Sequence, residues 1–453
     1  MNGIKYPELL TDLYELTMAQ AYWQHGQTAP ATFSLFARRL PEERGYLITA
    51  GLEDVLAYLE SFHFTTGAIE YLRSTGFFTE DFLHYLRGLR FTGEVWAMRE
   101  GRVFFADEPV VEVTAPVIEG QIVETFIINQ VNVQSTIATK AARCVEAARG
   151  RRLVDFSFRR TQGVETGLKV ARASYLAGFD ATSNVHAGER YGIPVSGTMA
   201  HAFVTSYEHE VEAFRAFAES FPGNCVLLID TYDTMDGARN AVTVAKEMAK
   251  RGHKLRGVRL DSGDMLDLSK RVRALLDDEG LHEVQIIASG GLDEYGIDDL
   301  LSGGGPVDGF GVGTKMGVSA DVPYLDTAYK MVAYGERPVL KLSTGKLTLP
   351  GPKQVYRRYN ENGAMEHDYI SRRDDDADGE PLLECVMRDG RRTAPQVPLE
   401  ETRNLCMKDR ERLPERFRRI RQPADYPVQL TPELERLLER TEGQAKQREL
   451  GES

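Results

Sequence analysis

Reactive and glycine-rich residues close a series of short apolar runs between Leu153 and Gly317. Because most of these runs are separated by stretches with helical spacing, they are typical of βα units that close into a barrel. In such barrels the chemistry lies at the carboxyl ends of the strands, so we expect one site built from the ends of these runs. The runs are LVDFSFRR (153–160), TSNV (182–185), IPVSGTMAH (193–201), CVLLIDTYDT (225–234), GVRLDSGD (257–264), VQIIASGG (284–291) and GFGVGT (309–314).

The last two runs contain glycine-rich sequences, SGG (289–291) and GVGT (311–314). Glycine lets backbone N–H groups approach an anion closely, and successive N–H groups can surround phosphate oxygens. A phosphate site commonly lies in the loops after the last two strands of a barrel. Tight βα turns that need a positive φ would also explain the glycines. Because both sequences stand at the end of the series, we favour a sugar-phosphate site.

Pairs of aspartates lie at the ends of two other runs: Asp230 with Asp233, and Asp261 with Asp264. Their oxygens could hold Mg²⁺ or accept hydrogen bonds from ribose hydroxyls. Asp233 and Asp264 each precede a stretch with helical spacing, where an aspartate can cap the amino end of the helix. We therefore prefer Asp230 and Asp261 as the ligands and interpret Asp233 and Asp264 as helix caps.

Three arginines are candidates for binding anions at the same strand ends. Arg159 and Arg160 end the first run, and Arg259 lies within GVRLDSGD. A guanidinium group suits carboxylate and phosphate groups because it presents several N–H donors in one plane. An ion pair with Asp155 or Asp261 is the structural alternative for these side chains.

His201 follows a run of small residues, VSGTMA, and the packing of a barrel requires no imidazole there. A lone histidine is often a structural residue. The functional alternatives are a metal ligand, a general base, or a nucleophile that accepts a phosphoryl group. Metal binding would call for further histidines, and neither His186 nor His209 is at a helical i, i+4 offset from His201. These residues alone do not decide between base and nucleophile.

Length and composition exclude several classes of protein. A chain of 453 residues predicts two or three domains, and 42% hydrophobic with 27% charged residues is typical of globular proteins. The net charge of −13 argues against a nucleic-acid-binding protein. The sequence shows no secretory signal and no uncharged apolar stretch near the roughly 20 residues that span a bilayer, so we expect a cytoplasmic protein without a membrane partner. The four cysteines form no C-x-x-C pair and are interpreted as reduced thiols.

Antiparallel β structure is expected on both sides of the barrel. The segment 91–118 alternates apolar and polar residues and carries turn signals, and short strands recur after about residue 325. The acidic segment 371–380 is interpreted as a solvated loop because its spacing matches no calcium-binding loop. The further expectations are helices at 7–25, 51–62, 80–88 and 119–150, strands at 31–40, 338–344, 353–359 and 381–387, and an amphipathic helix from 431.

Six sequences together resemble the nicotinate phosphoribosyltransferase family. The resemblance spans roughly residues 5–358 and implies a type II phosphoribosyltransferase fold, an irregular α/β barrel flanked by a sandwich-like α+β domain. We accordingly expect the N-terminal part of the flanking domain at 1–118, the catalytic barrel at 119–325, and its C-terminal part, with antiparallel strands and a terminal helix, at 326–453. The six sequences are TDLYELTMAQAYW (11–23), DFSFRRTQG (155–163), SGTMAH (196–201), DTYDT (230–234), GVRLDSGD (257–264) and GVGTKM (311–316).

The activity of the family implies what this chain would do. It would join nicotinate to 5-phosphoribosyl 1-diphosphate and release nicotinate mononucleotide and diphosphate, a step of NAD biosynthesis and salvage. The resemblance also implies a C–N bond-forming enzyme of the ligase type, which couples turnover to ATP hydrolysis through a phosphohistidine and uses Mg²⁺. It further implies a homodimer whose active site lies near the interface between the subunits.

The resemblance assigns the nicotinate contacts to residues from two parts of the chain. Tyr14 and Phe156 would contact the two faces of the pyridine ring, which suits aromatic side chains. Thr198, Arg159 and Arg259 would contact nicotinate, and the two arginines would also balance the charges of its carboxylate and of diphosphate.

The remaining roles concern phosphate, ribose and ATP. Asp261 would lie near ribose or Mg²⁺ with Asp230 assisting, and His201 corresponds to the histidine that the family phosphorylates from ATP. The 5-phosphate would be bound by Ser289, Gly290, Gly291, Gly313 and Thr314.

The resemblance also implies which form of the pyridine is the substrate. Relatives that use nicotinamide have an aspartate on the strand that here reads Thr182-Ser183-Asn184. An aspartate accepts a hydrogen bond from an amide NH₂ but repels a carboxylate. The neutral residues of this chain therefore favour the acid, nicotinate, as substrate.

Two other classes of protein compete with this interpretation. A metal-dependent barrel hydrolase or aldolase would use His201, Asp230 and Asp261 as ligands, but the other strand ends supply no further histidines. A non-catalytic sensor would keep only a nucleotide pocket, and the intact His201, Arg159 and Arg259 argue against lost catalysis.

Overall fold

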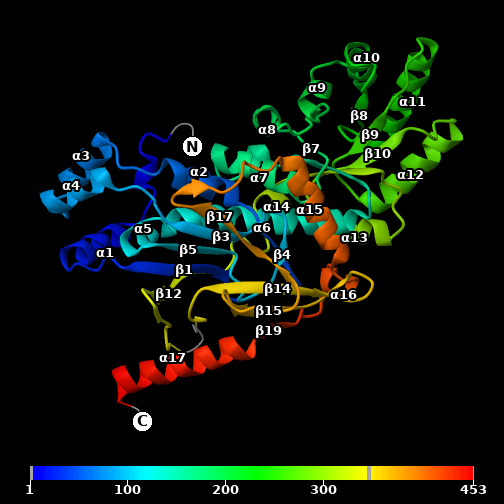
Figure 1. Cartoon of the computed structure of the whole chain (residues 1–453). Coiled ribbons are helices and arrows are strands. Elements are labelled where there is room, and N and C mark those ends of the chain that lie inside the picture. Colours follow the sequence, from blue (N-terminus) through cyan, green and yellow to red (C-terminus); the bar gives the residue numbers. More distant parts are fainter. Residues whose placement is uncertain (1–3, 344–347, 452–453) are drawn as a thin grey trace. The chain divides into compact units, whose positions relative to one another are not determined.

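The computed structural model describes residues 4–343 and 348–451, and the chain divides into two compact units (Figure 1). The first unit combines Met1–Thr136 with Tyr324–Ser453, and the second unit is Ile137–Pro323. The first unit is therefore assembled from both ends of the chain. In the described ranges, no helix combines the length and the apolar character that crossing a membrane requires.

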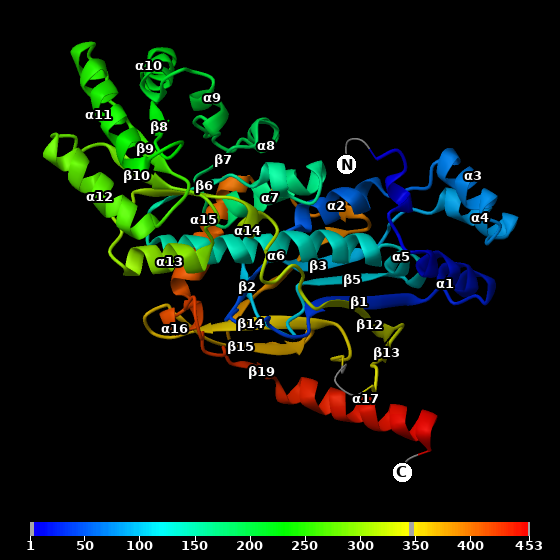
Figure 2. The same ribbon diagram turned by 180° about the vertical axis from the view of Figure 1, so that it is seen from behind.

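A six-stranded parallel sheet forms the centre of the second unit, with the strand order β7-β6-β11-β10-β9-β8 (Figure 2). Because parallel strands are joined by crossover connections, the carboxyl ends of all six strands lie at one edge of the sheet. The predicted series of βα units is confirmed. The strands are β6 (Arg152–Asp155), β7 (Ala181–Thr182), β8 (Val226–Leu228), β9 (Gly257–Leu260), β10 (Gln285–Ala288) and β11 (Gly309–Val312).

One predicted run of the series forms no strand of this sheet. The run 193–201 contributes only an isolated parallel bridge between Val195 and Thr182. Pro194 has no N–H group to donate, and the small residues that follow offer little side-chain surface for packing against a sheet. The parallel sheet therefore ends at β7 on this side, apart from that bridge.

Helices alternate with these strands and begin at polar caps. The carboxylates of Asp233 and Asp264 each accept two backbone N–H bonds from the first turn of a helix, at 2.9 Å and 3.1 Å respectively. The prediction that these two aspartates cap helices is confirmed. The helical segments are α6 (Glu124–Ala148), which leads in from the first unit, η2 (Phe158–Arg160), α7 (Val164–Leu176), α8 (Val185–Tyr191), α9 (His201–Thr205), α10 (Glu210–Ser220), α11 (Thr234–Lys250), α12 (Met265–Asp278), α13 (Glu294–Ser302) and α14 (Thr314–Gly317).

The first unit contains a seven-stranded sheet of order β13-β12-β1-β5-β3-β17-β18, a four-stranded sheet of order β16-β14-β15-β19 and the pair β2-β4. The larger sheet is antiparallel and mixes strands from both ends of the chain, which confirms the flanking α+β domain of the predicted fold class. The strands are β1 (Pro30–Ala37), β2 (Leu47–Ile48), β3 (Glu94–Met98), β4 (Val103–Phe104), β5 (Val111–Pro116), β12 (Thr327–Tyr334), β13 (Arg337–Pro338), β14 (Lys353–Tyr359), β15 (Met365–Arg372), β16 (Glu380–Pro381), β17 (Leu383–Arg388), β18 (Arg391–Arg392) and β19 (Val428–Leu430).

The helices predicted at 51–62 and 80–88 are confirmed, whereas two predicted helices are each divided. The helix expected at 119–150 breaks at Val123, between α5 (Val117–Ile122) and α6. The helix expected at 7–25 is divided into a short 3₁₀ turn, η1 (Pro7–Leu9), and α1 (Leu13–Gln24), because Asp12 at the start of α1 has extended backbone angles. The amphipathic terminal helix is confirmed as α17 (Pro432–Leu450), with Leu434, Leu437 and Thr441 buried. The other helices are α2 (Leu52–Ser61), α3 (Thr66–Ser74), α4 (Glu80–Gly88), α5 (Val117–Ile122), α15 (Leu399–Arg412) and α16 (Glu415–Arg418).

Two strand predictions in the first unit differ from the structure. The strand expected at 338–344 is wrong, because only Pro338 belongs to a strand, residues 339–343 form none, and Thr344 lies outside the described residues. In contrast, β12 was not predicted. It pairs along its length with β1, and Tyr329 stacks on Phe33 with ring centroids 5.0 Å apart. The loop expected at 371–380 is confirmed between the end of β15 and the start of β16.

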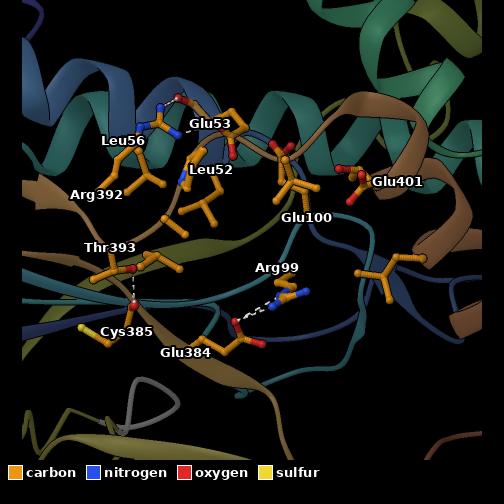
Figure 3. Close-up of a pocket in the computed structure, with 16 residues that line it drawn as sticks. Leu52, Glu53, Leu56, Arg99, Glu100, Glu384, Cys385, Arg392, Thr393 and Glu401 are labelled. Atoms are coloured by element: carbon orange, nitrogen blue, oxygen red, sulfur yellow. Dashed lines mark hydrogen bonds and ion pairs between the residues drawn. The ribbon is translucent and has the colours of Figure 1, made fainter.

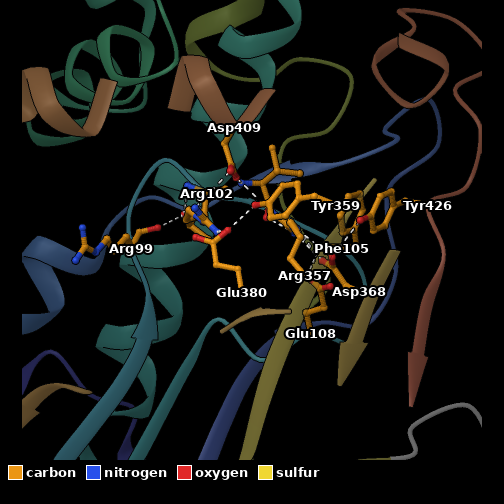
Figure 4. Close-up of polar contacts among 12 residues, drawn as sticks. Arg99, Arg102, Phe105, Glu108, Arg357, Tyr359, Asp368, Glu380, Asp409 and Tyr426 are labelled. Carbon is orange, nitrogen blue, oxygen red and sulfur yellow. Dashed lines mark hydrogen bonds and ion pairs between the residues drawn. The ribbon is translucent and has the colours of Figure 1, made fainter. Parts of the chain in front are cut away.

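A buried network of charged side chains joins distant segments of the first unit (Figure 4). Arg357 on β14 pairs with Asp368 on β15 at 2.6 Å and with Asp409 on α15 at 3.3 Å. Asp409 also accepts the backbone N–H of Val103 on β4 at 2.8 Å. Because a buried charge without a partner is costly, this network holds the C-terminal strands and helix against β4. All four cysteines are free thiols, and Cys385 is the one that is half-buried rather than buried.

Candidate active site

Arg259, on strand β9, brings three of the predicted nicotinate contacts together. Its Nη1 donates to the hydroxyl of Thr198 at 2.5 Å, and its Nη2 donates to the backbone carbonyl of Met199 at 2.9 Å. The guanidinium carbon lies 5.9 Å from the centre of the Phe156 ring. A cationic group beside an aromatic ring is a favourable arrangement, and both groups suit contact with an aromatic carboxylate.

The side chain of Arg259 is half-buried, and its guanidinium is incompletely paired. Its Nε atom has no hydrogen-bond partner among the described residues. Burial lowers the pKa of Arg259, the charges of Asp261 and Asp230 raise it, and the charge of Arg159 lowers it. Since arginine stays charged in proteins, a bound anion would supply the interaction that burial has removed.

Asp230 and Asp261 follow the neighbouring strands β8 and β9 and are connected by a hydrogen bond. Oδ2 of Asp230 accepts the backbone N–H of Asp261 at 2.9 Å and the hydroxyl of Ser262 at 2.6 Å. Oδ1 of Asp261 accepts the hydroxyl of Ser289 at 2.5 Å. Oδ1 of Asp230 is buried and has no partner in the described chain, so it is the oxygen of this pair that suits a cation or a hydroxyl group of a ligand.

The SGG sequence after β10 takes the tight turn that only glycine adopts easily. Gly290 and Gly291 have φ angles of 87° and 67°. A Cβ atom on Gly290 would lie 1.8 Å from the carbonyl oxygen of Asp261, whereas no atom lies within 4 Å of one on Gly291. A tight turn with positive φ, the structural alternative to a phosphate site, therefore accounts in part for these two glycines. The open space at Gly291 also leaves room for a ligand next to the backbone.

The GVGT sequence after β11 needs its glycines for a different reason. Gly313 has a φ of −121°, so a turn with positive φ does not account for it. A Cβ on Gly311 would lie 2.4 Å from the ring of Phe156, and one on Gly313 would lie 3.1 Å from the carbonyl oxygen of Phe156. These glycines allow the Phe156 segment to pack against β11. Thr314 accepts a long hydrogen bond of 3.5 Å from Arg160.

The two glycine-rich loops are linked by an ion pair that the sequence analysis did not identify. Nζ of Lys315, on α14, lies 3.3 Å from Oδ2 of Asp293. Oδ1 of Asp293 also caps α13 by accepting the N–H of Gly296 at 3.1 Å. In the sequence, Asp293 directly precedes a helical stretch, a position typical of a helix cap, and this was the feature that could have identified it.

The turn that contains Arg159 is positioned by a buried aspartate. Asp155, at the end of β6, accepts the backbone N–H of Ser157 at 2.8 Å, its hydroxyl at 2.5 Å, and the hydroxyl of Thr182 at 2.8 Å. Burial raises the pKa of Asp155, and these hydrogen bonds lower it. The ion pair considered between Asp155 and Arg159 does not form within the described residues. The exposed guanidinium of Arg159 therefore stays available to an anion.

His201 is the first residue of α9, and its ring faces the end of β8. Nδ1 lies 3.1 Å from the hydroxyl of Thr231, which follows Asp230. The described chain gives Nε2 no partner. It also contains no group of three or more His, Cys, Asp or Glu side chains that could hold a metal ion.

Tyr14 belongs to the first unit, and its contact with the pyridine ring stays a prediction. It is 47% exposed on α1, so its ring is accessible to a ligand. Burial raises the pKa of its neighbour Glu15 to about 7. Glu15 accepts hydrogen bonds from the backbone N–H and the hydroxyl of Thr125 at 3.0 and 2.7 Å, which fixes this part of α1.

The segment Thr182-Ser183-Asn184 leaves one side chain free for a ligand. The hydroxyl of Thr182 is bonded to Asp155, and Asn184 caps α8 through the N–H of Ala187 at 3.1 Å. Ser183 between them is exposed. The specificity for nicotinate that the segment implies stays a prediction.

A second cavity, in the first unit, contains none of the predicted site residues (Figure 3). It has a volume of about 220 Å³ and lies among α2, β17, α15 and the turn after β3. Two of its arginines are already paired, Arg99 with Glu384 and Arg392 with Glu53. We therefore place the candidate active site at the strand ends of the second unit.

Comparisons with known proteins agree with this site. The family model described as the nicotinate phosphoribosyltransferase (NAPRTase) family matches residues 151–336, which include every strand of the parallel sheet. Models of the N-terminal and C-terminal domains of nicotinate phosphoribosyltransferase match residues 9–132 and 376–438.

Relatives with similar sequences and structures carry related names. The chain is 47% identical to nicotinate phosphoribosyltransferase pncB2 of Mycobacterium tuberculosis strain H37Rv. The 428 aligned residues cover 94% of this chain and 92% of that relative. The chain is 40% identical to nicotinate phosphoribosyltransferase of Bacillus subtilis strain 168, covering 93% and 92%. The crystal structure of human nicotinic acid phosphoribosyltransferase superposes with a TM-score of 0.86 at 30% identity, covering 95% of this chain and 100% of that one. The nicotinate-nucleotide pyrophosphorylase structure from Pyrococcus furiosus has a TM-score of 0.75 at 25% identity, covering 91% and 99%.

Proposed function

The chain belongs to the nicotinate phosphoribosyltransferase family, and on that premise we propose that it joins nicotinate to 5-phosphoribosyl 1-diphosphate in NAD biosynthesis. The products are nicotinate mononucleotide and diphosphate. The observation that supports this most is Arg259, which is half-buried beside Phe156 and retains an Nε donor without a partner among the described residues. An aromatic face next to an unused guanidinium donor suits an aromatic carboxylate.

The reaction is a displacement at the anomeric carbon. A C–N bond forms from the pyridine nitrogen, and the C–O bond to diphosphate breaks with its electron pair leaving on the diphosphate oxygen. No protein nucleophile is needed for this step, so the residues act by position and charge. Phe156, Thr198 and Arg259 orient nicotinate, the glycine-rich loops bind the 5-phosphate, and Arg159 with Arg259 neutralises the departing diphosphate.

Asp230 and Asp261 are the residues that would hold Mg²⁺. The buried Oδ1 of Asp230 has no protein partner in the described chain, which fits a cation that takes one or two carboxylates and completes its shell with phosphate oxygens and water. The ion would supply positive charge to the diphosphate group when bound.

His201 is proposed as the residue that couples ATP to turnover. Its Nε2 would attack the γ-phosphorus of ATP, so that an N–P bond forms, the bond to the bridging oxygen breaks, and ADP leaves. Its Nδ1, 3.1 Å from the hydroxyl of Thr231, would keep the ring oriented during this transfer. We also propose the ligase-type classification, a cytoplasmic location, and a homodimer whose subunits complete the site with residues such as Tyr14.

The test is an assay of nicotinate mononucleotide with the purified full chain, nicotinate, 5-phosphoribosyl 1-diphosphate and Mg²⁺, with and without ATP. We expect product with nicotinate, little with nicotinamide, and a rise in product with ATP. Equal turnover of nicotinamide would contradict the proposed specificity, and no product under any condition would contradict the activity.

The ATP coupling has its own experiment. After incubation with ATP, intact-mass spectrometry at neutral pH should show an increase of about 80 Da, one phosphoryl group, on the wild type and not on His201→Ala. Equal labelling of the variant would show that His201 is not the acceptor. Labelling absent from both proteins would contradict the phosphohistidine mechanism while leaving the transferase activity intact.

A further inference from the structure

An open pocket lies at the opposite edge of the parallel sheet from the candidate active site. It has a volume of about 730 Å³ and is lined by the residues directly before β6, β10 and β11 together with the first residues of β6 and β10. These segments are 149–152, 282–285 and 306–308, and Arg273 of α12 adds one more side chain. All of them belong to the second unit. No step of the proposed reaction uses them.

Arginines are the most frequent side chains in the lining of this amino-edge pocket. Four arginines and two carboxylates, Glu283 and Asp308, line it, and two of the arginines are each paired with an aspartate outside the lining. Oδ2 of Asp308 accepts the backbone N–H of Ile286 at 2.8 Å and is thus engaged with the sheet. The four arginines are Arg149, Arg151, Arg152 and Arg273.

Two of these arginines have their donors engaged by the protein. Arg273 donates from Nε to Asp277 and from its terminal nitrogens to the carbonyls of Val284 and Leu281, at 2.7 to 2.9 Å. Arg149 donates from Nη2 to Asp298 and Ser302 at 2.8 and 2.7 Å. The fold holds these two side chains in place, and Asp298 and Asp277 balance their charges.

The other two arginines have donors to spare. Arg151 uses only Nε, which donates to the carbonyl of Val307 at 2.8 Å and so fixes the orientation of its guanidinium group. The guanidinium of Arg152 has no hydrogen bond or ion pair with any described residue. Both side chains line the pocket, so the terminal nitrogens of Arg151 and all the nitrogens of Arg152 can serve a ligand. Guanidinium groups in this arrangement suit phosphate oxygens.

We propose that the amino-edge pocket binds an oligophosphate anion at a site separate from the active site. Its volume falls within the range of small-molecule sites, and the two guanidinium groups with free donors, those of Arg151 and Arg152, suit an anion with more than one negative group. Its lining contains no Phe, Tyr or Trp side chain, and its one imidazole, that of His282, is held by Asp277 at 3.1 Å. Recognition therefore rests on the phosphates, and the exposed Glu283 limits the affinity by repulsion.

The test is isothermal titration calorimetry of the full chain at low ionic strength with inorganic triphosphate as the probe. The wild type should show two binding events, since the candidate active site also binds phosphate groups. Arg259→Gln should weaken one event, and Arg152→Gln should weaken the other about tenfold, in keeping with one lost charge-assisted contact. Because Arg152 is exposed and unbonded, this substitution leaves the fold intact, and its activity in the nicotinate assay should equal that of the wild type.

A matched control separates a site from general electrostatics. Arg271→Gln removes one exposed positive charge from α12, a surface outside the pocket, and should leave both binding events unchanged. A single event that Arg259→Gln alone removes would overturn the proposal, as would equal weakening by Arg152→Gln and Arg271→Gln. ATP should bind the pocket as tightly as triphosphate does, and a clear preference for ATP would overturn recognition by phosphate alone.

Discussion

Nζ of Lys315 lies 3.3 Å from Oδ2 of Asp293, and this ion pair joins the loop after β10 to the loop after β11. The two loops contain the glycine-rich sequences that we expect to bind the 5-phosphate. Asp293 is only 12% exposed, whereas Lys315 is 48% exposed, so the aspartate is part of the fold and the lysine approaches it from outside. The pair therefore holds one phosphate loop at a set distance from the other.

Lys315→Met should weaken binding of the phosphoribosyl donor more than it slows the chemistry. An exposed ion pair contributes about 0.2–1 kcal/mol, so we expect the KM for 5-phosphoribosyl 1-diphosphate to rise up to about fivefold with kcat changed less than twofold. Steady-state kinetics measure both constants. Lys246→Met, which removes the ion pair between Lys246 on α11 and Glu279 just after α12, is the control and should change neither constant. A fall in kcat at constant KM would contradict a positioning role.

Arg259→Lys should lower kcat/KM for nicotinate about tenfold to a hundredfold. A lysine ammonium cannot serve Thr198, Met199 and a carboxylate with the planar geometry of a guanidinium, and each charge-assisted hydrogen bond contributes about 1.5–3 kcal/mol. The measurement is initial-rate kinetics at varied nicotinate. Arg256→Lys, at a nearby exposed arginine just before β9, should behave as the wild type. Unchanged kcat/KM in Arg259→Lys would remove this residue from the proposed nicotinate site.

The parts of this structure that the sequence predicted are those decided by local interactions. Asp233 and Asp264 could be identified as helix caps because a cap bonds to residues two and three positions further along the chain. Identifying these caps left Asp230 and Asp261 as the ligand candidates, and the structure places them on adjacent strands. Their roles toward Mg²⁺ or ribose stay predictions.

The features that the sequence did not reveal depend on contacts between distant residues. The strand β12 forms because it pairs with β1, about 300 positions earlier in the chain. Residues 339–343 are also largely apolar, but they form no strand. The pair between Lys315 and Asp293 arises only when two parallel strands lie side by side. No periodicity or spacing within either segment indicates such a contact.

Gly290→Ala and Gly291→Ala should differ sharply in stability although the residues are neighbours. Both have positive φ angles, which cost a residue with a side chain about 1–2 kcal/mol. A Cβ on Gly290 would also lie 1.8 Å from the carbonyl oxygen of Asp261, so the backbone must shift. For Gly291→Ala, urea denaturation should show a loss of about 1–2 kcal/mol in the free energy of unfolding, the cost of the positive φ alone. For Gly290→Ala the loss should be at least about 3 kcal/mol. Equal losses would show that the close approach to Asp261 does not exist.

Glu108 should make the first unit less stable as the pH rises. It is fully buried next to the network of Arg357, Asp368, Asp409 and Tyr426 (Figure 4). Its Oε2 accepts the backbone N–H of Phe105 at 2.8 Å, and among the described residues its Oε1 has no hydrogen-bond partner. Burial, followed by the negative charge of Asp368, raises the pKa of Glu108 well above its usual value, and the charge of Arg357 lowers it only in part.

A carboxyl group whose pKa is raised by folding contributes its full stability below the pKa of the unfolded chain and loses it as the pH rises through the folded pKa. Glu108→Gln keeps the shape of the side chain but cannot ionise. The free energy of unfolding of the wild type should therefore fall relative to that of Glu108→Gln between pH 5 and pH 9, by up to about 1.4 kcal/mol per pH unit while Glu108 titrates. Urea denaturation of both proteins across this range measures the difference. Glu439→Gln, on the exposed side of α17, should show the same pH dependence as the wild type. Parallel curves for the wild type and Glu108→Gln would mean that Glu108 is ionised in the folded chain and that the surrounding arginines compensate its burial.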